Sequence, residues 1–422
     1  MSGSTAATER LWFHDSHRLE FDGRVVAARM DGTRAAVELD RTAFYPTGGG
    51  QPHDTGVLRL EGDASGWRVD EVAATEDDRV VHYLSRSDGG APLPEVGATL
   101  HGAVDAARRR DHLQQHTGQH LLSAALVRAA GIATKSFHMG ATTSTIDVEP
   151  RLTDEPLERA VALANEVVFD DRATRIHLVG PDQLERFAIR RQTFTGAQIR
   201  LIEVPDFDVS TCGGTHAQRT GEVGLIAVLG VEKSKGLQRV EFVCGGRALQ
   251  SFTAGRKALV EVARELSCAT DLAAAGVRRL ADAAKAAHKR ATRWFEAGLE
   301  PAAAALAATA RPVGAAALVT AWRDDLSFDE ALALARATIA KGGLVVALAV
   351  PDGTGAKLLL ARSNDVACGA GELVKQLAPR FQLRGGGSPP QAQAALPDRG
   401  VLDALFAELA TLLAAPRSTT FS

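Results

Sequence analysis

The sequence predicts an α+β protein built from four parts, and three observations carry this prediction. Segments 23–39 and 56–72 alternate apolar and polar residues between turns rich in Gly and Asp, which is typical of β-strands. Residues 105–130 repeat their apolar positions at helical spacing instead. Near residue 251 the composition shifts to Ala, Leu, Arg, Lys and Glu, which favours long helices. We therefore predict an N-terminal β-barrel domain, a mixed α/β domain with metal ligands, a helical spacer and a small C-terminal α/β domain, over residues 1–104, 105–250, 251–310 and 311–422.

The composition limits the classes of protein to which the chain can belong. Its 422 residues are 45% hydrophobic, which is enough to form large hydrophobic cores. The sequence contains no run of about 18 apolar residues, so it predicts no membrane span. The first residues are polar and charged, so we do not expect a secretory signal there. Four scattered cysteines do not suggest a disulfide framework, so we expect a reducing cytoplasm. With a net charge of −3, any surface for nucleic acid must be a local patch.

Two short motifs each offer a pair of metal ligands. His116 and His120 lie one turn apart on the predicted helix, so both imidazoles can reach one ion. Cys212 and His216 flank two glycines that permit a tight turn. One cysteine and three histidines form a borderline-soft donor set that suits tetrahedral zinc better than magnesium or calcium. The sequence therefore predicts one zinc ion held by these four residues.

The sequence does not distinguish a structural zinc site from a catalytic one. A metalloprotease helix carries Glu after its first His, where this chain has Thr117, so peptide hydrolysis by that scheme is not expected. Four protein ligands would close the shell of a structural ion, whereas a catalytic ion keeps one position for water, which could replace His216. His112 lies one turn before His116, and we expect it to be an exposed side chain rather than a group that acts on the ion.

Two glycine-rich segments could approach a ligand closely. The first, Gly48 to Gly50, lies between predicted strands and is followed by Gln51, which can donate and accept hydrogen bonds. The second follows Arg384 and is predicted to be a loop whose amides could meet a phosphate or a base. The spacer between them is interpreted as solvated helix, although it carries basic residues that could touch phosphates: Arg278, Arg279, Lys285, Lys289, Arg290 and Arg293.

Several of these motifs, taken in order, resemble one family. The segments 44–52, 116–122 and 212–216, together with 136–140 and 231–242, are similar to the alanyl-tRNA editing proteins of the AlaX type, which are related to the editing domain of alanyl-tRNA synthetase. The likeness spans roughly residues 10–250. The C-terminal part resembles the DHHA1-type domain of the long forms, although Ala394 and Ala395 stand where the family has further glycines. We see no aminoacylation domain before residue 10, so we do not expect the chain to charge tRNA.

The resemblance implies a zinc-dependent deacylase that hydrolyses tRNA(Ala) mischarged with serine, and with glycine as a second substrate. It implies that Gln51, His138 and Thr42 act at the site, with Thr42 reading the serine hydroxyl. Substrate would be bound by the backbone of Gly48, Gly49 and Gly50, and tRNA by Arg384, Gly385 and Gly386. The spacer or the C-terminal domain could also pair two chains into a homodimer. The alternative is a non-catalytic RNA-binding protein with a structural zinc.

Overall fold

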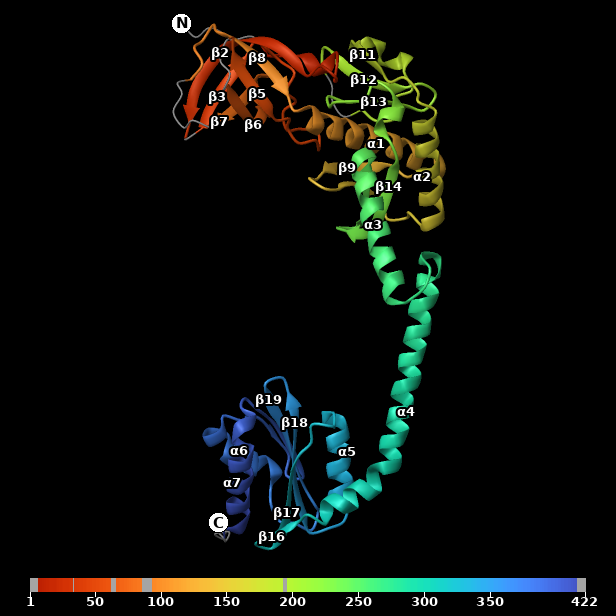
Figure 1. The fold of residues 1–422 in the computed structure, drawn as a ribbon. Coiled ribbons are helices and arrows are strands. Elements are labelled where there is room, and N and C mark those ends of the chain that lie inside the picture. Colours follow the sequence, from red (N-terminus) through yellow and green to blue (C-terminus); the bar gives the residue numbers. More distant parts are fainter. Residues whose placement is uncertain (1–6, 33, 62–65, 86–92, 193–195, 416–422) are drawn as a thin grey trace. The chain divides into compact units, whose positions relative to one another are not determined.

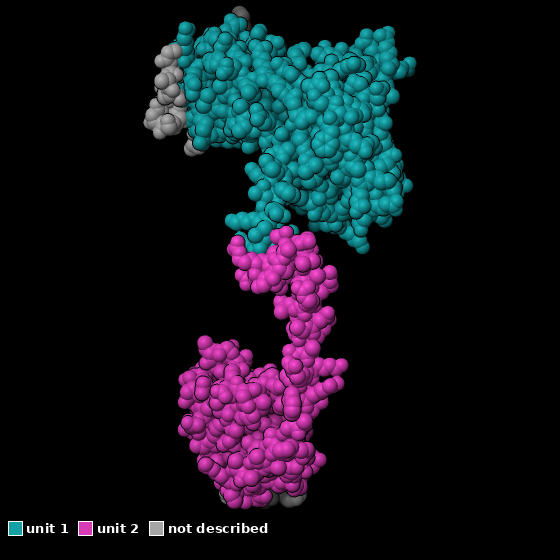
Figure 2. Space-filling view, turned by 45° about the vertical axis from the view of Figure 1, so that its right-hand side comes forward, with its two compact units in different colours: residues 1–261 teal, residues 262–422 magenta. Residues whose placement is uncertain are grey.

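The computed structural model describes residues 7–32, 34–61, 66–85, 93–192 and 196–415. The chain divides into two compact units, residues 1–261 and 262–422, each with its own hydrophobic core (Figure 2). Within the described ranges, no helix is long and apolar enough to cross a membrane. The expected α+β content is confirmed in both units, whereas the finer division into four domains stays a prediction.

The N-terminal part of the first unit is a closed six-stranded barrel, as expected (Figure 1). In β2, Phe21, Gly23 and Val25 are buried while Asp22 and Arg24 between them are exposed, which explains the pattern in the sequence. A short parallel pair, β1 (Glu9–Arg10) with β4 (Arg41–Thr42), lies beside it. The barrel strands, in their order around the barrel, are β2 (Glu20–Asp31), β3 (Arg34–Leu39), β7 (Val80–Ser85), β6 (Trp67–Ala74), β5 (Gly56–Leu60) and β8 (Thr99–Val104).

The central element of the first unit is helix α1 (Ala106–Ala130). The Asp105 carboxylate caps its N-terminus by accepting from the Ala107 and Arg108 amides, and Gly131 ends it in the left-handed conformation at φ 64°. Most of its C-terminal half is buried because α2 (Asp154–Phe169) and a four-stranded sheet pack around it. The helix predicted over 105–130 is therefore confirmed, and its His-bearing turns lie inside the unit.

Two antiparallel sheets complete the first unit. The four-stranded sheet has the order β14-β15-β10-β9, and its strands contribute to the core around α1. A three-stranded sheet, β11-β12-β13, leads directly into the Cys212 motif. The bounds are Ile226–Ser234 for β14, Leu237–Cys244 for β15, Ser144–Val148 for β10, Thr134–Met139 for β9, Arg175–Val179 for β11, Ile199–Val204 for β12 and Asp208–Thr211 for β13.

Two long helices follow, as the composition predicts. Helix α3 (Gly245–Glu265) begins earlier than the shift at residue 251, because Gly245 starts it directly after β15. Helix α4 (Ala273–Ala307) follows the short 3₁₀ turn Thr270–Leu272, and most of its residues are exposed.

The rest of the second unit is a six-stranded mixed sheet with helices on two faces (Figure 1). Helix α5 (Phe328–Ile339) packs with the end of α4 on one core, and α6 (Ala370–Phe381) with α7 (Leu402–Ala414) on the other. The order is β16 (Arg311–Val313), β17 (Ala316–Trp322), β18 (Leu344–Asp352), β19 (Gly355–Arg362), β21 (Gln391–Leu396) and β20 (Arg384–Gly387).

The glycine segment after Arg384 is a strand, not the predicted loop. It forms β20, an edge strand that pairs with β21. A Cβ at Gly385 would lie 2.1 Å from the Gln393 carbonyl oxygen, and one at Gly387 would lie 2.3 Å from that of Gln391. The glycines therefore allow β20 to lie against its neighbour, a close approach that the sequence pattern alone does not distinguish from a flexible turn.

A buried histidine lies in the wall of the barrel. The two ring nitrogens of His82 face the Thr42 hydroxyl at 2.9 Å and the Val37 carbonyl oxygen at 3.1 Å. The Thr42 hydroxyl also accepts from the Phe44 amide. Burial lowers the pKa of His82 to about 4, although the Val37 carbonyl and the Glu38 carboxylate oppose that shift. His82 is therefore neutral in the folded barrel at neutral pH.

This histidine predicts a pH dependence of stability. His82 takes up a proton in the unfolded chain below pH 6.5 but in the barrel only below about pH 4. Its contribution to the free energy of unfolding is thus complete above pH 6.5 and is lost as the pH falls towards 4. The loss is at most about 3 kcal/mol. Urea unfolding at pH 7.5 and 4.5, with chelator throughout, should show less pH dependence for His82→Gln than for the wild type.

The matched control is His101→Gln, which changes an exposed histidine on β8 that pairs with Asp22. Equal pH dependence in His82→Gln and His101→Gln would contradict the role given to His82.

Candidate metal centre and its cavity

Four potential metal ligands from two distant segments converge in the first unit. His116 and His120 come from α1, and Cys212 and His216 from the turn after β13. Their ligand atoms all lie within 4.8 Å of one another, and His116 Nε2 is 3.2 Å from Cys212 Sγ. The His116 and His120 rings are nearly parallel, 15° apart, as expected one helical turn from each other. The structure therefore brings the four predicted ligands together.

The Cys212 turn fits against α1 because it lacks side chains there. A Cβ at Gly214 would lie 2.3 Å from Cε1 of the His116 ring. Neither Gly213 nor Gly214 has a left-handed φ, so the motif needs its glycine for space rather than for a special turn. The buried guanidinium of Arg200 donates to the carbonyl oxygens of Cys212 and Gly214 at 2.8 Å, and this fixes the turn.

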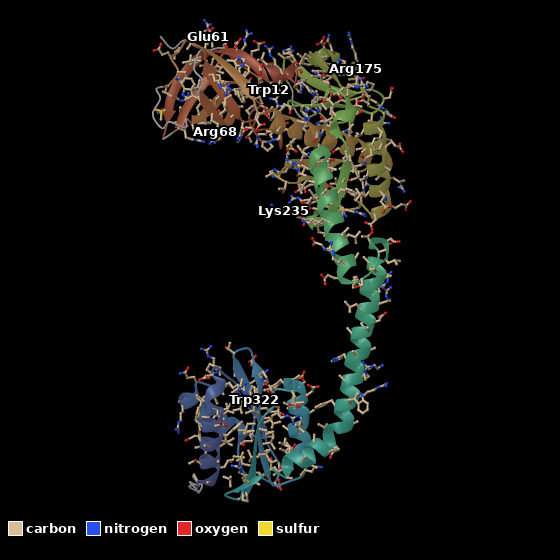
Figure 3. The ribbon with its side chains drawn as sticks, viewed as in Figure 1. Trp12, Glu61, Arg68, Arg175, Lys235 and Trp322 are labelled. Atoms are coloured by element: carbon tan, nitrogen blue, oxygen red, sulfur yellow. The ribbon has the colours of Figure 1, made fainter. Side chains whose placement is uncertain are left out.

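A tryptophan ties the same turn to the barrel side of the unit. Trp12 Nε1 donates to the Gly213 carbonyl oxygen at 3.1 Å, and its ring packs edge-on against Tyr45. Figure 3 shows Trp12 where the barrel meets the sheet that carries the turn. The metal motifs and the glycine segment of the barrel are thus held by one continuous set of contacts.

Gln51 contacts the potential metal ligand His116 and does not line the cavity beside it. Its side-chain oxygen lies 2.7 Å from His116 Nδ1, and its amide nitrogen donates to the Thr215 hydroxyl at 2.9 Å. With Nδ1 protonated and donating to Gln51, His116 would direct the lone pair of Nε2 towards an ion placed among the four ligands. Gln51 is 1% exposed, so its chemistry in this structure is to orient His116.

The first glycine segment packs against strand β9. Gly48 and Gly49 line the cavity beside the ligands, whereas Gly50, at φ 84°, accepts from the Met139 amide at 2.8 Å. A Cβ at Gly50 would lie 2.4 Å from the Phe137 carbonyl oxygen. Gly50 is therefore required both for its backbone conformation and for space.

A buried ion pair anchors this segment to α1. Asp54 accepts from the Arg109 guanidinium and from the Tyr45 amide, and all three groups are buried. Burial alone would raise the pKa of Asp54, but Arg109 and His112 outweigh it and lower that pKa. His112, which we expected to be exposed, is 2% exposed and lies 3.6 Å from Asp54, so that prediction is wrong.

A second carboxylate lies behind His120. Asp208 Oδ2 is 3.6 Å from His120 Nδ1, and the Arg190 guanidinium donates to both Asp208 oxygens. Burial opposes ionisation of Asp208, but the bonds from Arg190 and the nearby His120 ring outweigh it and lower its pKa to about 2. Asp208 is therefore ionised at neutral pH.

The electrostatics of the cluster fit a metal ion. Burial works against the Cys212 thiolate, yet the three imidazoles hold the pKa of that thiol well below its ordinary value. Burial lowers the pKa of His216 to about 3, so this ring is neutral. Both of its nitrogens are buried and have no hydrogen-bond partner in the structure. A thiol with a lowered pKa, next to imidazoles with unsatisfied buried nitrogens, is a donor set that could hold a metal ion.

A cavity of about 540 Å³ opens on this cluster. Its lining includes three of the four ligands, His116, His120 and Cys212. Aromatic and basic side chains and the Gly48–Gly49 backbone form much of the rest, and these side chains are Trp12, Phe13, Tyr45, Phe137, Arg10, Lys135, Arg190 and Arg191. The size lies within the range of about 300–1,000 Å³ usual for small-molecule sites.

Two residues expected at the site lie elsewhere. Thr42 is fully buried in the barrel, and its hydroxyl is bonded to His82 and Phe44. His138 on β9 is exposed and does not line the cavity, whereas its neighbour Phe137 does and packs on His116. Because successive side chains of a strand alternate, β9 can point only one of these two residues inward. Arg384, Gly385 and Gly386 lie in the second unit, on β20.

Sequence reasoning missed several residues that hold the centre. Arg200, Arg109 and Asp54 gave no pattern that separates them from surface charges. Asp208 did leave a signal, because Asp208 and Ser210 alternate along β13 and so share a face, and Cys212 directly follows that strand. Gln119, which lines the cavity and donates to the Ser123 hydroxyl, was visible in the helical motif but had no assigned role.

Comparison with known proteins places these motifs in a family context. Residues 199–241 match the family described as "Threonyl and Alanyl tRNA synthetase second additional domain", and residues 14–108 match "tRNA synthetases class II (A)". The C-Ala domain of Aquifex aeolicus alanyl-tRNA synthetase aligns with 25% of the chain and 99% of that domain, at 18% identity and a TM-score of 0.24, which is too low to carry an inference.

Curated relatives match over longer stretches. The alanyl-tRNA editing protein AlaX-L of Pyrococcus horikoshii is 32% identical over 247 residues, which cover 58% of this chain and 60% of that protein. The alanine–tRNA ligase of Pyrobaculum neutrophilum is 35% identical over 399 residues, which cover 92% of this chain and 42% of that enzyme. The chain thus spans 60% or less of the length of these relatives. These matches confirm the resemblance that the motifs indicated: the chain is a relative of the AlaX-type alanyl-tRNA editing proteins and of alanyl-tRNA synthetase.

Proposed function

We propose that the protein is a zinc-dependent deacylase that hydrolyses tRNA(Ala) carrying the wrong amino acid, serine first and glycine second. The observation that carries this proposal is the Cys/His cluster opening into a cavity, in a chain similar to an alanyl-tRNA editing protein. Editing answers a physical limit on selection. A pocket for a small apolar side chain cannot strongly reject an isostere with an added hydroxyl, so a second, hydrolytic site must remove it.

The chemistry asked of the site is modest, because an aminoacyl ester is already activated. When bound, zinc would supply a Lewis acid for the ester carbonyl and would lower the pKa of a bound water. His116, His120 and Cys212 would hold it, with His216 or the water as the fourth ligand. Gln51 and Asp208 would keep the His116 and His120 rings oriented, so the site needs little rearrangement during the reaction.

The cavity walls suit the end of a charged tRNA. The Gly48 amide already donates to the Gln51 carbonyl, so we propose the backbone of Gly49 as the loop's contact to substrate. Arg10 and Lys135 line the cavity with part-exposed side chains and would attract the phosphates of the tRNA 3′ end. Gln119, which lines the cavity, is better placed to contact the amino acid than Thr42, whose hydroxyl is bonded to His82 inside the barrel.

We expect purified protein to hydrolyse Ser-tRNA(Ala) and to spare Ala-tRNA(Ala). Removing a preorganised group that stabilises developing charge typically costs 100-fold or more in rate, so chelation should lower the rate by at least about 100-fold and added zinc should restore it. The assay follows release of labelled serine with and without chelator.

Two results would contradict the proposal in different ways. Hydrolysis unaffected by chelation would remove the metal from the mechanism. Full zinc content without hydrolysis of any mischarged tRNA(Ala) would favour a non-catalytic RNA-binding protein with a structural zinc.

Metal analysis should find about one zinc per chain, and Cys212→Ala or His120→Ala should reduce it strongly, because each removes a ligand. Affinity should fall below about pH 6, since thiolate and imidazole bind only when deprotonated. The matched control is Cys268→Ala, which removes a cysteine outside the cluster. Unchanged zinc in Cys212→Ala would show that the ion lies elsewhere.

We also propose that the region after the first unit binds tRNA. The basic residues noted on α4, between Arg278 and Arg293, are exposed, as is Arg384 on the edge strand β20. A second contact on the same chain raises apparent affinity through effective concentration. Exposed apolar side chains, such as Phe252 on α3 and Leu280 and Trp294 on α4, could instead pair two chains into a homodimer.

Truncation to residues 1–261 separates these roles, because this unit has its own core. We expect the fragment to keep its zinc and its kcat on Ser-tRNA(Ala) while KM rises about tenfold or more, the effect of losing a tethered contact. The fragment's mass in solution, measured alongside, reports dimerisation. An unchanged KM, together with a full-length dimer that becomes a monomer on truncation, would assign the C-terminal region to oligomerisation.

A further inference from the structure

Strand β13 presents two polar side chains behind the ligand His120. Asp208 and Ser210 lie on the same face of this strand, which ends at Thr211 directly before Cys212. The side chain of Asp208 is only 3% exposed, and its Oδ2 is 3.6 Å from His120 Nδ1. That nitrogen is buried and has no hydrogen-bond partner in the structure, so Asp208 is the acceptor that a small rotation of the ring would bring into range.

The Asp208 carboxylate is itself held in place. Arg190 Nε donates to Oδ1 at 2.6 Å and Nη2 to Oδ2 at 2.9 Å, while the Ser210 hydroxyl lies 3.2 Å from both oxygens. The Arg190 backbone is fixed as well, because its amide donates to the Val209 carbonyl oxygen. A bidentate guanidinium contact of this kind compensates the buried charge and sets the direction of the carboxylate.

We propose that Asp208, fixed by Arg190, is the positioning residue of the metal ligand His120. It accepts a hydrogen bond from the Nδ1–H group of His120, which selects the tautomer that presents Nε2 to the ion. This inference rests on the proposed metal centre, and it adds a carboxylate to the amide that Gln51 provides for His116. A carboxylate that accepts a hydrogen bond from an imidazole makes that ring a stronger metal ligand than an amide acceptor does. His120 would therefore bind the ion more strongly than His116.

A purely structural role for the Asp208–Arg190 pair is the competing explanation. That role predicts a loss of stability without a specific effect on metal affinity or on the geometry around the ion. The test therefore measures the metal centre directly, in the full chain and without reference to catalysis.

The experiment compares wild type, Asp208→Asn and the control Asp206→Asn, a nearby exposed aspartate with the same change of charge. Zinc affinity is measured by chelator competition, and cobalt-substituted protein gives the absorption spectrum of the coordination geometry. We expect Asp208→Asn to bind zinc about 10–100-fold more weakly with an altered cobalt spectrum, and Asp206→Asn to match the wild type. Asp208→Glu, which keeps the carboxylate, should recover part of the affinity.

Zinc affinity and a cobalt spectrum unchanged in Asp208→Asn would overturn the proposal, as would equal losses in both aspartate variants. If Asp208→Asn does not fold, Arg190→Gln tests the same link by freeing the carboxylate, and unchanged affinity there would overturn it. A wild type that binds zinc but does not hydrolyse charged tRNA would contradict the proposed function and leave this inference standing. A wild type that binds no zinc would overturn the inference.

Discussion

The close approach of the Cys212–His216 turn to helix α1 is the constraint on which the candidate site depends. A thiolate and three imidazoles can share one ion only if the turn lies directly on the helix, and the missing side chain at Gly214 makes that possible. Arg200 holds the turn by two bonds to its carbonyl oxygens, at the cost of burying a guanidinium whose Nη2 has no partner. A buried donor without a partner typically lowers the free energy of unfolding by about 1–3 kcal/mol. The two bonds from Arg200 that fix the turn are therefore made at a loss of stability.

The barrel serves the same centre from the opposite side. Its glycine segment reaches α1 through the buried Asp54–Arg109 pair, and it carries Gln51 to His116. Breaking a buried ion pair by removing one partner costs about 3–5 kcal/mol, so this anchor is sensitive to substitution although it touches no ligand of the cluster. The two sheets beyond α1 supply the remaining contacts, through Phe137 on β9 and Asp208 on β13. The centre is thus supported by the barrel, by α1 and by both sheets of the first unit.

Features with a strong local pattern could be predicted from the sequence. The apolar periodicity of α1 and of the barrel strands is typical of those elements. The spacing of the four clustered ligands is likewise typical of a metal site. Thr42 and His138 could not be placed, because both lie in strands where a shift by one residue exchanges the inner and outer faces. The burial of His112 was not predicted, because its partner Asp54 is distant in the sequence. The glycines of β20 were predicted to form a loop, because close strand packing and a flexible loop both favour glycine.

The central claim, that one metal ion is held jointly by the α1 histidines and the Cys212 turn, is tested most directly by X-ray absorption at the zinc edge of the purified protein. The account predicts one sulfur ligand at about 2.3 Å and two or three nitrogen ligands at about 2.0–2.1 Å. A zinc ion with only nitrogen and oxygen ligands, or a purified protein that takes up no zinc, would contradict it.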